Sequence, residues 1–326
     1  MAKITSKDVA RLAGVSRTTV SLVLNNVDNA RISEATSEKV LKAAKQLKYR
    51  PNALAQSLKT NRSKIIGLII PSITNPFFPS IAQGVEDTAV SKGYNVFLCN
   101  TFREPEKENS YIQALASKQV DGIIFASMTF NPEAILELRR RGVAIVAFDR
   151  RVNDQDVDAV LFDNVKGGEM AVKYLLSLGH RNIAFLSGKT DIFSRRDRLE
   201  GYKKALQDAE VAINHDYIAI DNFQEQENRD RNYEIEAGFR IANKLLDKSP
   251  EVTALFAVND MTALGALKAI KSRGLRVPED ISLVGFDDIN LAEITDPPLT
   301  TIRQPKYKMG KTSAELLISR LEEEKS

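Results

Sequence analysis

The hydrophobic residues beyond residue 64 fall in short runs, separated by longer stretches with amphipathic spacing. Each run holds four to six mostly aliphatic residues, which is typical of strands buried on both faces of a parallel sheet. The first set of runs predicts strands at 65–70, 94–99, 121–126 and 143–148, with helices near 77–92, 106–118 and 132–142. This alternation predicts an α/β fold with helices on the faces of a parallel sheet.

A second set of runs repeats the pattern and predicts a second sheet. Its expected strands are 159–162, 182–187, 217–220, 254–258 and 281–286, again with helices between them. Two such sheets form two lobes that face a cleft. All runs are far shorter than the roughly 18 apolar residues that cross a bilayer, so we expect no membrane segment.

The N-terminal segment 5–26 has a different pattern, that of two short helices joined by one tight turn. Thr5 can cap the first helix, and Gly14 permits the left-handed backbone that a sharp turn needs. Ser16 can cap the second helix, in which Val20, Val23 and Leu24 would face inward. The opposite side of that helix is predicted to carry Arg17, Thr18, Ser21, Leu22 and Asn25.

This outward side is a candidate reader of DNA bases. Arg17 suits the O6 and N7 atoms of guanine, and Leu22 could contact a thymine methyl group. The alternative is an ordinary amphipathic helical hairpin. Charge favours DNA, because residues 1–64 hold 13 lysines and arginines against four acidic residues. This segment therefore carries +9, and the rest of the chain −6, within a net charge of +3, as expected for a module that binds phosphates.

The sequence TSKDVARLAGVSRTTVSLVLNN, followed by KYRPNALAQSL, resembles the head piece of the lac repressor (LacI/GalR) family. The resemblance implies a third helix at about 33–47 and a hinge helix at 52–58 that enters the minor groove, where Leu58 would wedge open a base step. Leu58 could instead pack against the core. The DNA-contacting residues implied are Thr5, Ser16, Arg17, Thr18, Ser21, Leu22, Asn25, Asn52, Ala55, Gln56 and Leu58.

One position departs from the family pattern. Many members carry arginine where this sequence has Leu22. The groove-facing position of that residue carries over, but the base preference of the family does not.

The resemblance extends over almost the whole chain and implies its domain organisation. Residues 1–61 would form a three-helix helix-turn-helix head piece with its hinge helix, and 62–326 a two-lobed parallel α/β core like that of periplasmic binding proteins. We expect lobe 1 at about 62–161 and 304–326, and lobe 2 at about 162–303. The implied function is transcriptional regulation, expected to be repression, by a cytoplasmic homodimer on a palindromic operator.

Ligands of parallel α/β sheets bind at the carboxyl ends of strands, and polar residues follow several predicted strands. The family resemblance points to an arginine, Arg198, and Phe77 and Phe78 could stack on a ring. The candidate effector-binding residues are Phe77, Ser127, Asp149, Arg198, Asn259, Asp287 and Gln304. For strand-end residues such as Asp163 and Asp260, capping of the next helix is the alternative.

The expected effector is a small molecule, a sugar or sugar derivative. The clusters Arg150–Arg151 and Arg195–Arg196, which lie beside Asp149 and Arg198, suggest an anionic one such as a sugar acid or sugar phosphate. Ordinary solvation of surface arginines explains the same clusters.

Two other classes of protein have to be weighed. An enzyme is disfavoured because GxGxxG, GxxxxGK[ST], GxSxG and HExxH motifs are missing, and His180 and His215 have no partner that suggests metal or triad chemistry. We expect no cofactor. A secreted solute-binding protein would share the core but would need an export signal, and the N-terminus is polar. The single cysteine, Cys99, is expected to be a core residue.

Overall fold

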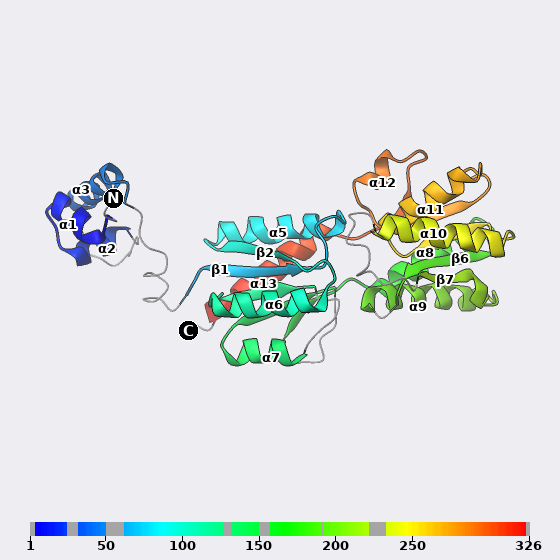
Figure 1. The fold of residues 1–326 in the computed structure, drawn as a ribbon, viewed down its shortest axis with the longest axis horizontal. Coiled ribbons are helices and arrows are strands. Elements are labelled where there is room, and N and C mark those ends of the chain that lie inside the picture. The colour runs from blue at the N-terminus through cyan, green and yellow to red at the C-terminus, as the bar shows by residue number, and fades with distance from the viewer. Residues whose placement is uncertain are drawn as a thin grey trace. The chain divides into compact units, whose positions relative to one another are not determined.

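The computed structural model describes residues 4–24, 32–49, 62–126, 132–149, 157–190, 192–221 and 233–323. The chain divides into two compact units, residues 1–63 and residues 64–326, and Figure 1 shows the elements of each. Within the described ranges, none of the helices is long and apolar enough to cross a membrane.

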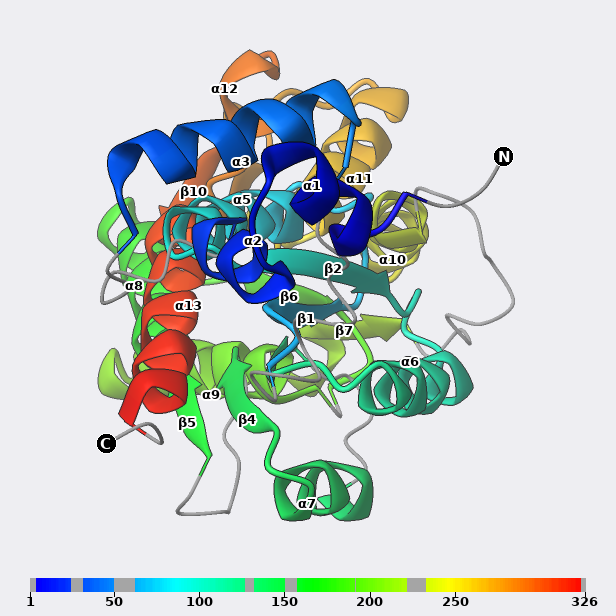
Figure 2. The same cartoon turned by 90° about the vertical axis from the view of Figure 1, so that its left-hand side faces the viewer.

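The first unit contains three helices, α1 (Ser6–Ala13), α2 (Arg17–Leu24) and α3 (Glu34–Gln46), seen together in Figure 2. Each helix contributes a fully buried valine to a small shared core: Val9, Val20 and Val40. The predicted turn is confirmed, since Gly14 has a φ of 67°. The Ser16 hydroxyl also caps α2 as predicted, accepting a hydrogen bond from the Thr19 N–H at 3.0 Å.

Lobe 1 of the second unit is built on a parallel sheet with the strand order β2-β1-β3-β4-β5. The strands are β1 (Ile65–Ile70), β2 (Asn95–Asn100), β3 (Gly122–Phe125), β4 (Ala144–Phe148) and β5 (Asp158–Val160). Helices α5 (Phe77–Ser91) and α13 (Lys306–Glu323) cover one face, and α6 (Pro105–Ser117) and α7 (Pro132–Arg140) cover the other. Cys99 lies in the core beneath α6, as predicted.

Lobe 2 is built on a second parallel sheet with the order β10-β9-β8-β6-β7. Its strands are β6 (Ile183–Gly188), β7 (Ile218–Asp221), β8 (Ala254–Ala257), β9 (Ser282–Asp287) and β10 (Thr300–Arg303). Helices α8 (Asn164–Ser177) and α9 (Phe193–Asp208) cover one face, and α10 (Tyr233–Lys248) and α11 (Asp260–Ser272) the other. Two short helices complete the lobe: a 3-10 helix, η1 (His215–Tyr217), and α12 (Leu291–Ile294).

Two features of the sheets differ from the sequence prediction. The assignment of the run 159–162 to the second sheet was wrong, because the strand there, β5, pairs with β4 in lobe 1. An apolar run predicts a strand but not its sheet, and here the chain enters lobe 2 only with α8. Strand β10 was not predicted, since three of the four residues in its sequence TTIR are polar and it lies at the edge of the sheet, next to β9.

Helix α13 returns the chain from lobe 2 to lobe 1, where two glycines permit its close packing on α5. A Cβ atom on Gly310 would lie 2.0 Å from the Ile81 carbonyl oxygen, and one on Gly84 would lie 2.2 Å from that of Tyr307. No side chain larger than hydrogen fits these positions without separating the helices. The chain therefore crosses between the lobes before α8 and again between β10 and α13.

In both sheets the order in which strands are added reverses at the same point, although all strands stay parallel. The chain moves outward from β1 to β2 and then back past β1 to β3, and likewise from β6 to β7 and back past β6 to β8. Such switch points leave a crevice at the carboxyl ends of the strands. The two lobes present these ends to a common cavity.

Candidate functional site

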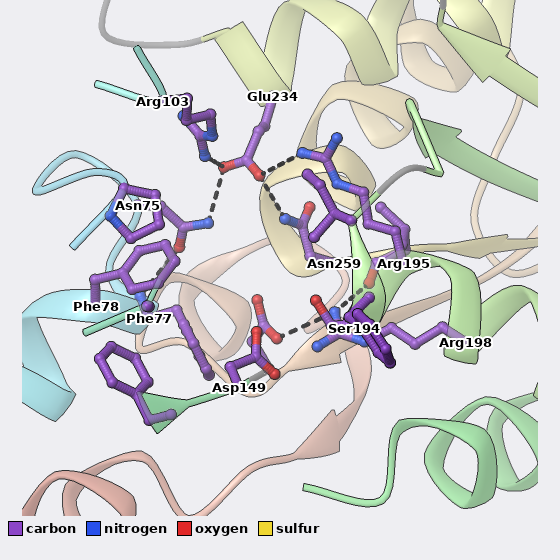
Figure 3. Close-up of a pocket in the computed structure, with 17 residues that line it drawn as sticks. Asn75, Phe77, Phe78, Arg103, Asp149, Ser194, Arg195, Arg198, Glu234 and Asn259 are labelled. Carbon is purple, nitrogen blue, oxygen red and sulfur yellow. Dashed lines mark hydrogen bonds and ion pairs between the residues drawn. The ribbon is translucent and has the colours of Figure 1, made fainter. Parts of the chain in front are cut away.

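A cavity of about 420 Å³ lies at the carboxyl ends of the strands and is lined by residues of both lobes. Lobe 1 contributes aromatic rings, shown in Figure 3: Phe77 and Phe78 at the start of α5 form an edge-to-face pair with ring centroids 5.1 Å apart. The Asn75 side-chain oxygen accepts a hydrogen bond from the Phe77 N–H at 3.0 Å, which fixes the start of the helix. Phe148 at the end of β4 adds a third ring.

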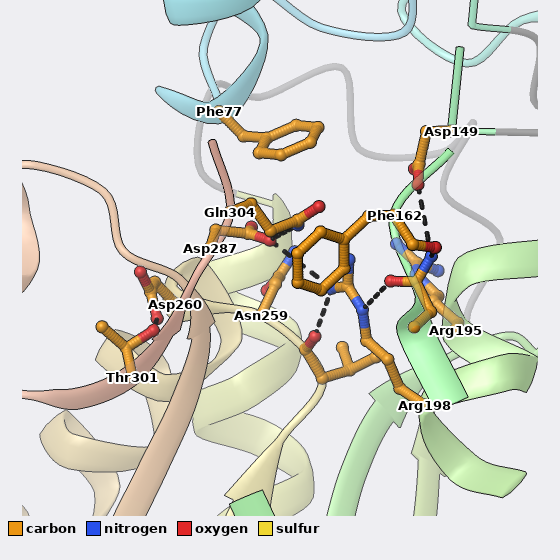
Figure 4. Close-up of polar contacts among 12 residues, drawn as sticks. Phe77, Asp149, Phe162, Arg195, Arg198, Asn259, Asp260, Asp287, Thr301 and Gln304 are labelled. Carbon is orange, nitrogen blue, oxygen red and sulfur yellow. Dashed lines mark hydrogen bonds and ion pairs between the residues drawn. The ribbon is translucent and has the colours of Figure 1, made fainter. Parts of the chain in front are cut away.

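Arg198 dominates the lobe 2 side of the cavity. It is 5% exposed, and its Nε donates to the Asn164 side-chain oxygen at 2.9 Å while an NH1 hydrogen goes to the Val258 carbonyl at 2.6 Å (Figure 4). The guanidinium carbon lies 3.7 Å from the centre of the Phe286 ring. These contacts fix the guanidinium plane, so its remaining donors have a defined direction.

Two aspartates lie near this guanidinium. An Asp287 carboxylate oxygen is 3.5 Å from Arg198 NH1 and accepts a hydrogen bond from the Gln304 amide at 2.7 Å. Burial raises the pKa of Asp287 well above its ordinary value, although Arg198 opposes the shift. Burial likewise raises the pKa of Asp149 against the opposing charge of Arg198. Burial and the Arg198 charge therefore act in opposite directions on the pKa of both carboxyl groups.

The opposite end of the cavity contains a buried carboxylate, Glu234, in the first turn of α10. One of its oxygens accepts a hydrogen bond from the Asn75 amide at 2.8 Å and lies 3.2 Å from Arg103. The other accepts from the Asn259 amide at 2.8 Å and lies 3.6 Å from Arg195. Burial acts to raise the pKa of Glu234, but the two arginines and the amide donors outweigh it, so the net pKa is lowered.

Most of the predicted effector-binding residues meet at this cavity. Five of them line it, namely Phe77, Asp149, Arg198, Asn259 and Asp287. Gln304 is 2% exposed and lies behind Asp287, to which it donates. Ser127 is outside the described residues.

The structure also shows which of the strand-end residues cap the next helix and which line the cavity. The Asp163 carboxylate caps α8 by accepting from the Lys166 N–H at 2.9 Å. Asn259 both caps α11 and lines the cavity. Its side-chain oxygen accepts from the Thr262 N–H at 2.9 Å, and its amide donates to Glu234 in the cavity wall. Asp260 neither caps a helix nor lines the cavity. It is fully buried and accepts hydrogen bonds from the Ile289 N–H and the Thr301 hydroxyl.

Four polar residues of the cavity wall were missed by the sequence interpretation: Asn75, Arg103, Ser194 and Glu234. A signal existed for two of them, because Asn75 lies two residues before Phe77 and Arg103 follows the strand β2. The sequence carried no signal for Glu234, which is the second residue of α10 and lies 13 residues after the end of β7. Of the arginines considered earlier, Arg195 is buried and Arg196 exposed, while Arg150 and Arg151 lie outside the described residues.

The candidate DNA-reading surface lies on α2. Arg17 and Thr18 are exposed, and Ser21 and Leu22 are half-buried, while Val20 and Val23 face the core. Thr5 and Ser16 are exposed at the starts of α1 and α2. Asn25, Asn52, Ala55, Gln56 and Leu58, with the predicted hinge helix, lie outside the described residues.

No group of three His, Cys, Asp or Glu side chains that could hold a metal ion occurs among the residues that the structure describes. His180 has two hydroxyl partners, Thr253 at its Nδ1 and Ser282 at its Nε2, each at 2.9 Å. These hydrogen bonds connect the segment before β6 to the starts of β8 and β9, so His180 has a structural role.

Models of two protein families match the chain. Residues 5–52 match "Bacterial regulatory proteins, lacI family", and residues 63–326 match "Periplasmic binding proteins and sugar binding domain of LacI family". The chain is 39% identical over 321 residues to the HTH-type transcriptional repressor PurR of Vibrio parahaemolyticus, covering 98% of this chain and 92% of that protein. It is 38% identical to PurR of Vibrio cholerae, with the same coverage.

Solved structures agree with this similarity. The lac repressor dimer bound to operator and the anti-inducer ONPF has a TM-score of 0.84 and 30% identity, covering 99% of this chain and 94% of that one. The complex of the regulator CelR with cellobiose gives 0.72 and 32%, with the same coverage. A LacI family regulator of Enterococcus faecium with bound ribose gives 0.70 and 34%, covering 79% and 90%.

Proposed function

This chain belongs to the LacI family of bacterial regulatory proteins, which are DNA-binding transcriptional regulators and not enzymes, and we propose that it represses transcription under the control of a neutral carbohydrate bound in the cavity. The head piece, residues 1–61, would bind operator DNA, and the core, 62–326, would bind the effector and form the dimer. We expect the protein in the cytoplasm, where its operator lies.

The proposal of a carbohydrate is based on the difference between the two sides of the cavity. A sugar ring has an apolar C–H face that packs on aromatic rings and a rim of hydroxyl groups that need donors and acceptors. Phe77 and Phe148 line one side, and Arg198 and Asp287 lie on the other. A guanidinium donates to two adjacent hydroxyls, and carboxyl groups bind the hydroxyl hydrogens. The ribose and cellobiose complexes of family members support this assignment.

Charge balance favours a neutral ligand over an anionic one. The described lining residues include three arginines and three acidic residues, Arg103, Arg195, Arg198, Asp149, Glu234 and Asp287. Arg103 and Arg195 already face Glu234, and Arg198 lies beside Asp287. A phosphate or sugar acid would have to displace one of these carboxylates from its partner, which is costly in a buried site.

Thermal unfolding with candidate ligands tests the effector class, because a ligand that binds only the folded state raises the unfolding temperature. We expect neutral pentoses or hexoses to raise it more than their phosphates, and more than planar nucleobases, which could also stack on phenylalanine. A larger shift with nucleobases or with sugar phosphates would contradict the proposal. The ligand that stabilises the protein should then change its affinity for operator DNA.

Dimerisation is proposed through lobe 1. Strand β2 is at the edge of its sheet, and its Phe97 and Leu98 are 40% and 50% exposed. Val90 of α5, a helix that packs against β2, is also exposed. An exposed apolar edge strand favours pairing with a second copy, and the lac repressor with the same fold was solved as a dimer. Two head pieces could then read the two half-sites of a palindrome.

DNA reading is assigned to α2, with Arg17, Thr18, Ser21, Leu22 and Asn25 facing the major groove and the segment 52–58 in the minor groove. Selection of bound duplexes from random DNA should give palindromic sites. Arg17→Ala should relax the preference at one base pair per half-site by about 1–3 kcal/mol. Arg11→Ala, which removes another exposed arginine of the head piece, should leave the base preference unchanged. Selected duplexes without a common sequence would refute the assignment.

A further inference from the structure

Glu234 contacts both lobes of the core through one carboxylate. Its Oε2 is bound by Asn75 and Arg103 of lobe 1, and its Oε1 by Asn259 and Arg195 of lobe 2. Figure 3 shows the four partners converging on this carboxylate from both sides of the cavity. The Glu234 side chain is 8% exposed, so the contacts are made away from bulk water, where charge-assisted hydrogen bonds are strong.

Separation of the lobes would break half of these bonds. Arg103 and Asn75 would leave with lobe 1, whereas Arg195 and Asn259 would stay beside Glu234 in lobe 2. A buried carboxylate depends on its partners, and removal of some of them is strongly unfavourable. Because all four partners belong to this chain, the contacts need no ligand to form.

The lobe 1 partners are held in position by their own backbone. Arg103 and the preceding Phe102 both have left-handed backbone, with φ values of 61° and 53°. Non-glycine residues rarely adopt this region, and they keep it only where the surrounding structure holds them there. Asn75 is fixed at the other side by its bond to the Phe77 N–H.

We propose that Glu234 is a positioning residue that latches lobe 1 to lobe 2, so that the closed arrangement of the core is populated before any effector binds. The latch sets the separation of the aromatic and polar walls of the cavity. An effector then meets a cavity that is already formed and does not have to supply the free energy of closure. This inference depends neither on the identity of the effector nor on DNA binding.

The test compares Glu234→Gln with a matched control. Glu169 is also a buried carboxylate of lobe 2, 4% exposed, but its cationic partners Lys166, Lys173 and Lys204 all belong to lobe 2. Glu169→Gln therefore removes a comparable buried charge without a contact between lobes. Both variants are made in the full-length chain.

The readout is the distance between spin labels on the two lobes, measured without sugar or DNA. The labelled protein is mixed with an excess of the same protein without labels, so that most dimers carry labels on one copy only. Labels are placed on cysteines introduced at the exposed helix positions Glu106 of lobe 1 and Glu200 of lobe 2, with Cys99 replaced by alanine. We expect one dominant short distance in the parent protein and in Glu169→Gln. In Glu234→Gln the ratio of open to closed molecules should rise about tenfold or more, the effect of one or two lost charge-assisted hydrogen bonds.

An unchanged distance distribution in a folded Glu234→Gln protein, or a parent protein that is already open, would overturn the proposal. If Glu234→Gln does not unfold cooperatively, Arg103→Gln weakens the same contact from lobe 1 and should give the same rise. An unchanged distribution in that variant would equally overturn it. Failure of the carbohydrate proposal would leave these distances untouched.

Discussion

The two lobes of the core share one sheet topology but build opposite sides of the cavity. In each, the chain runs outward by one strand and then returns past the first to complete a five-stranded parallel sheet. Both lobes contribute polar and apolar residues to the lining, but lobe 1 supplies three of the aromatic rings, Phe77, Phe78 and Phe148, and lobe 2 supplies one, Phe193. Lobe 2 supplies four charged side chains, Arg195, Arg198, Glu234 and Asp287, and lobe 1 supplies two, Arg103 and Asp149. The same fold thus supplies one wall richer in aromatic rings and one richer in charge.

The difference arises from what stands at the carboxyl ends of corresponding strands. In lobe 1 the sequence after β1 is PSITNPFF, which places two phenylalanines in the first turn of α5. In lobe 2 the helix after β6 is α9, which begins with a single phenylalanine, Phe193, and contains Arg195 and Arg198 in its first turns. Topology therefore decides where a ligand can lie, and the residues of the first helical turns decide its chemistry.

The largest effect is expected from loss of the central charge of lobe 2. Arg198→Ala leaves Asp287 and Asn164 without their buried partner, so the free energy of unfolding should fall by about 3–5 kcal/mol and carbohydrate affinity by at least about 100-fold. Urea unfolding and calorimetric titration measure the two effects. Arg196→Ala, which alters an exposed residue on the same helix, should change stability by less than about 0.5 kcal/mol. Equal effects of Arg198→Ala and Arg196→Ala would contradict the central role of Arg198 in the lobe 2 side of the cavity.

The stability of the protein should also depend on pH, because of Asp260 in lobe 2. Burial raises the pKa of Asp260 from 3.8 to about 6, against its bonds from Thr301 and Ile289. The folded protein therefore binds this proton more tightly than the unfolded chain does, and stability falls as pH rises from about 4 to 6. Asp260→Asn has no such proton, so relative to the parent protein it should gain up to about 3 kcal/mol across that range.

Urea unfolding of both proteins at pH 4, 5, 6 and 7 checks this prediction. The stability difference should level off above pH 6. Parallel pH profiles for Asp260→Asn and the parent protein would mean that Asp260 does not titrate in this window.

The smallest effect is expected from the aromatic wall of lobe 1. Phe77→Leu keeps an apolar side chain but removes the flat ring face, so carbohydrate affinity should fall about fivefold, or about 1 kcal/mol. Phe125→Leu, in a buried strand position of lobe 1 facing away from the cavity beneath α6, should lower stability but leave affinity unchanged. Calorimetric titration of both variants with the same sugar measures this. A loss of affinity as large as that of Arg198→Ala would mean that lobe 1 dominates binding.

Local sequence signals predicted those parts of the site that local structure positions. Gly14 and Ser16 marked the turn and the cap of the head piece, and Asp149 and Asn259 followed from the ends of apolar runs. Each of these residues acts within a few positions of the element that holds it. The strand 159–162 was found but placed in the wrong sheet, because pairing with β4 is a long-range contact.

The sequence by itself determined most of the order of strands and helices, the basic head piece and the strand-end residues Asp149, Asn259 and Asp287, since apolar periodicity, capping and strand ends are read over a few residues. Only the tertiary structure decided that Glu234 bonds Asn75, which lies 159 positions away in the sequence, and that Arg103 and Arg195 meet at the same carboxylate. It also decided the raised pKa values of Asp260 and Asp287. Desolvation and charge pairing depend on what surrounds a group in space, and that environment exists only after both lobes have folded.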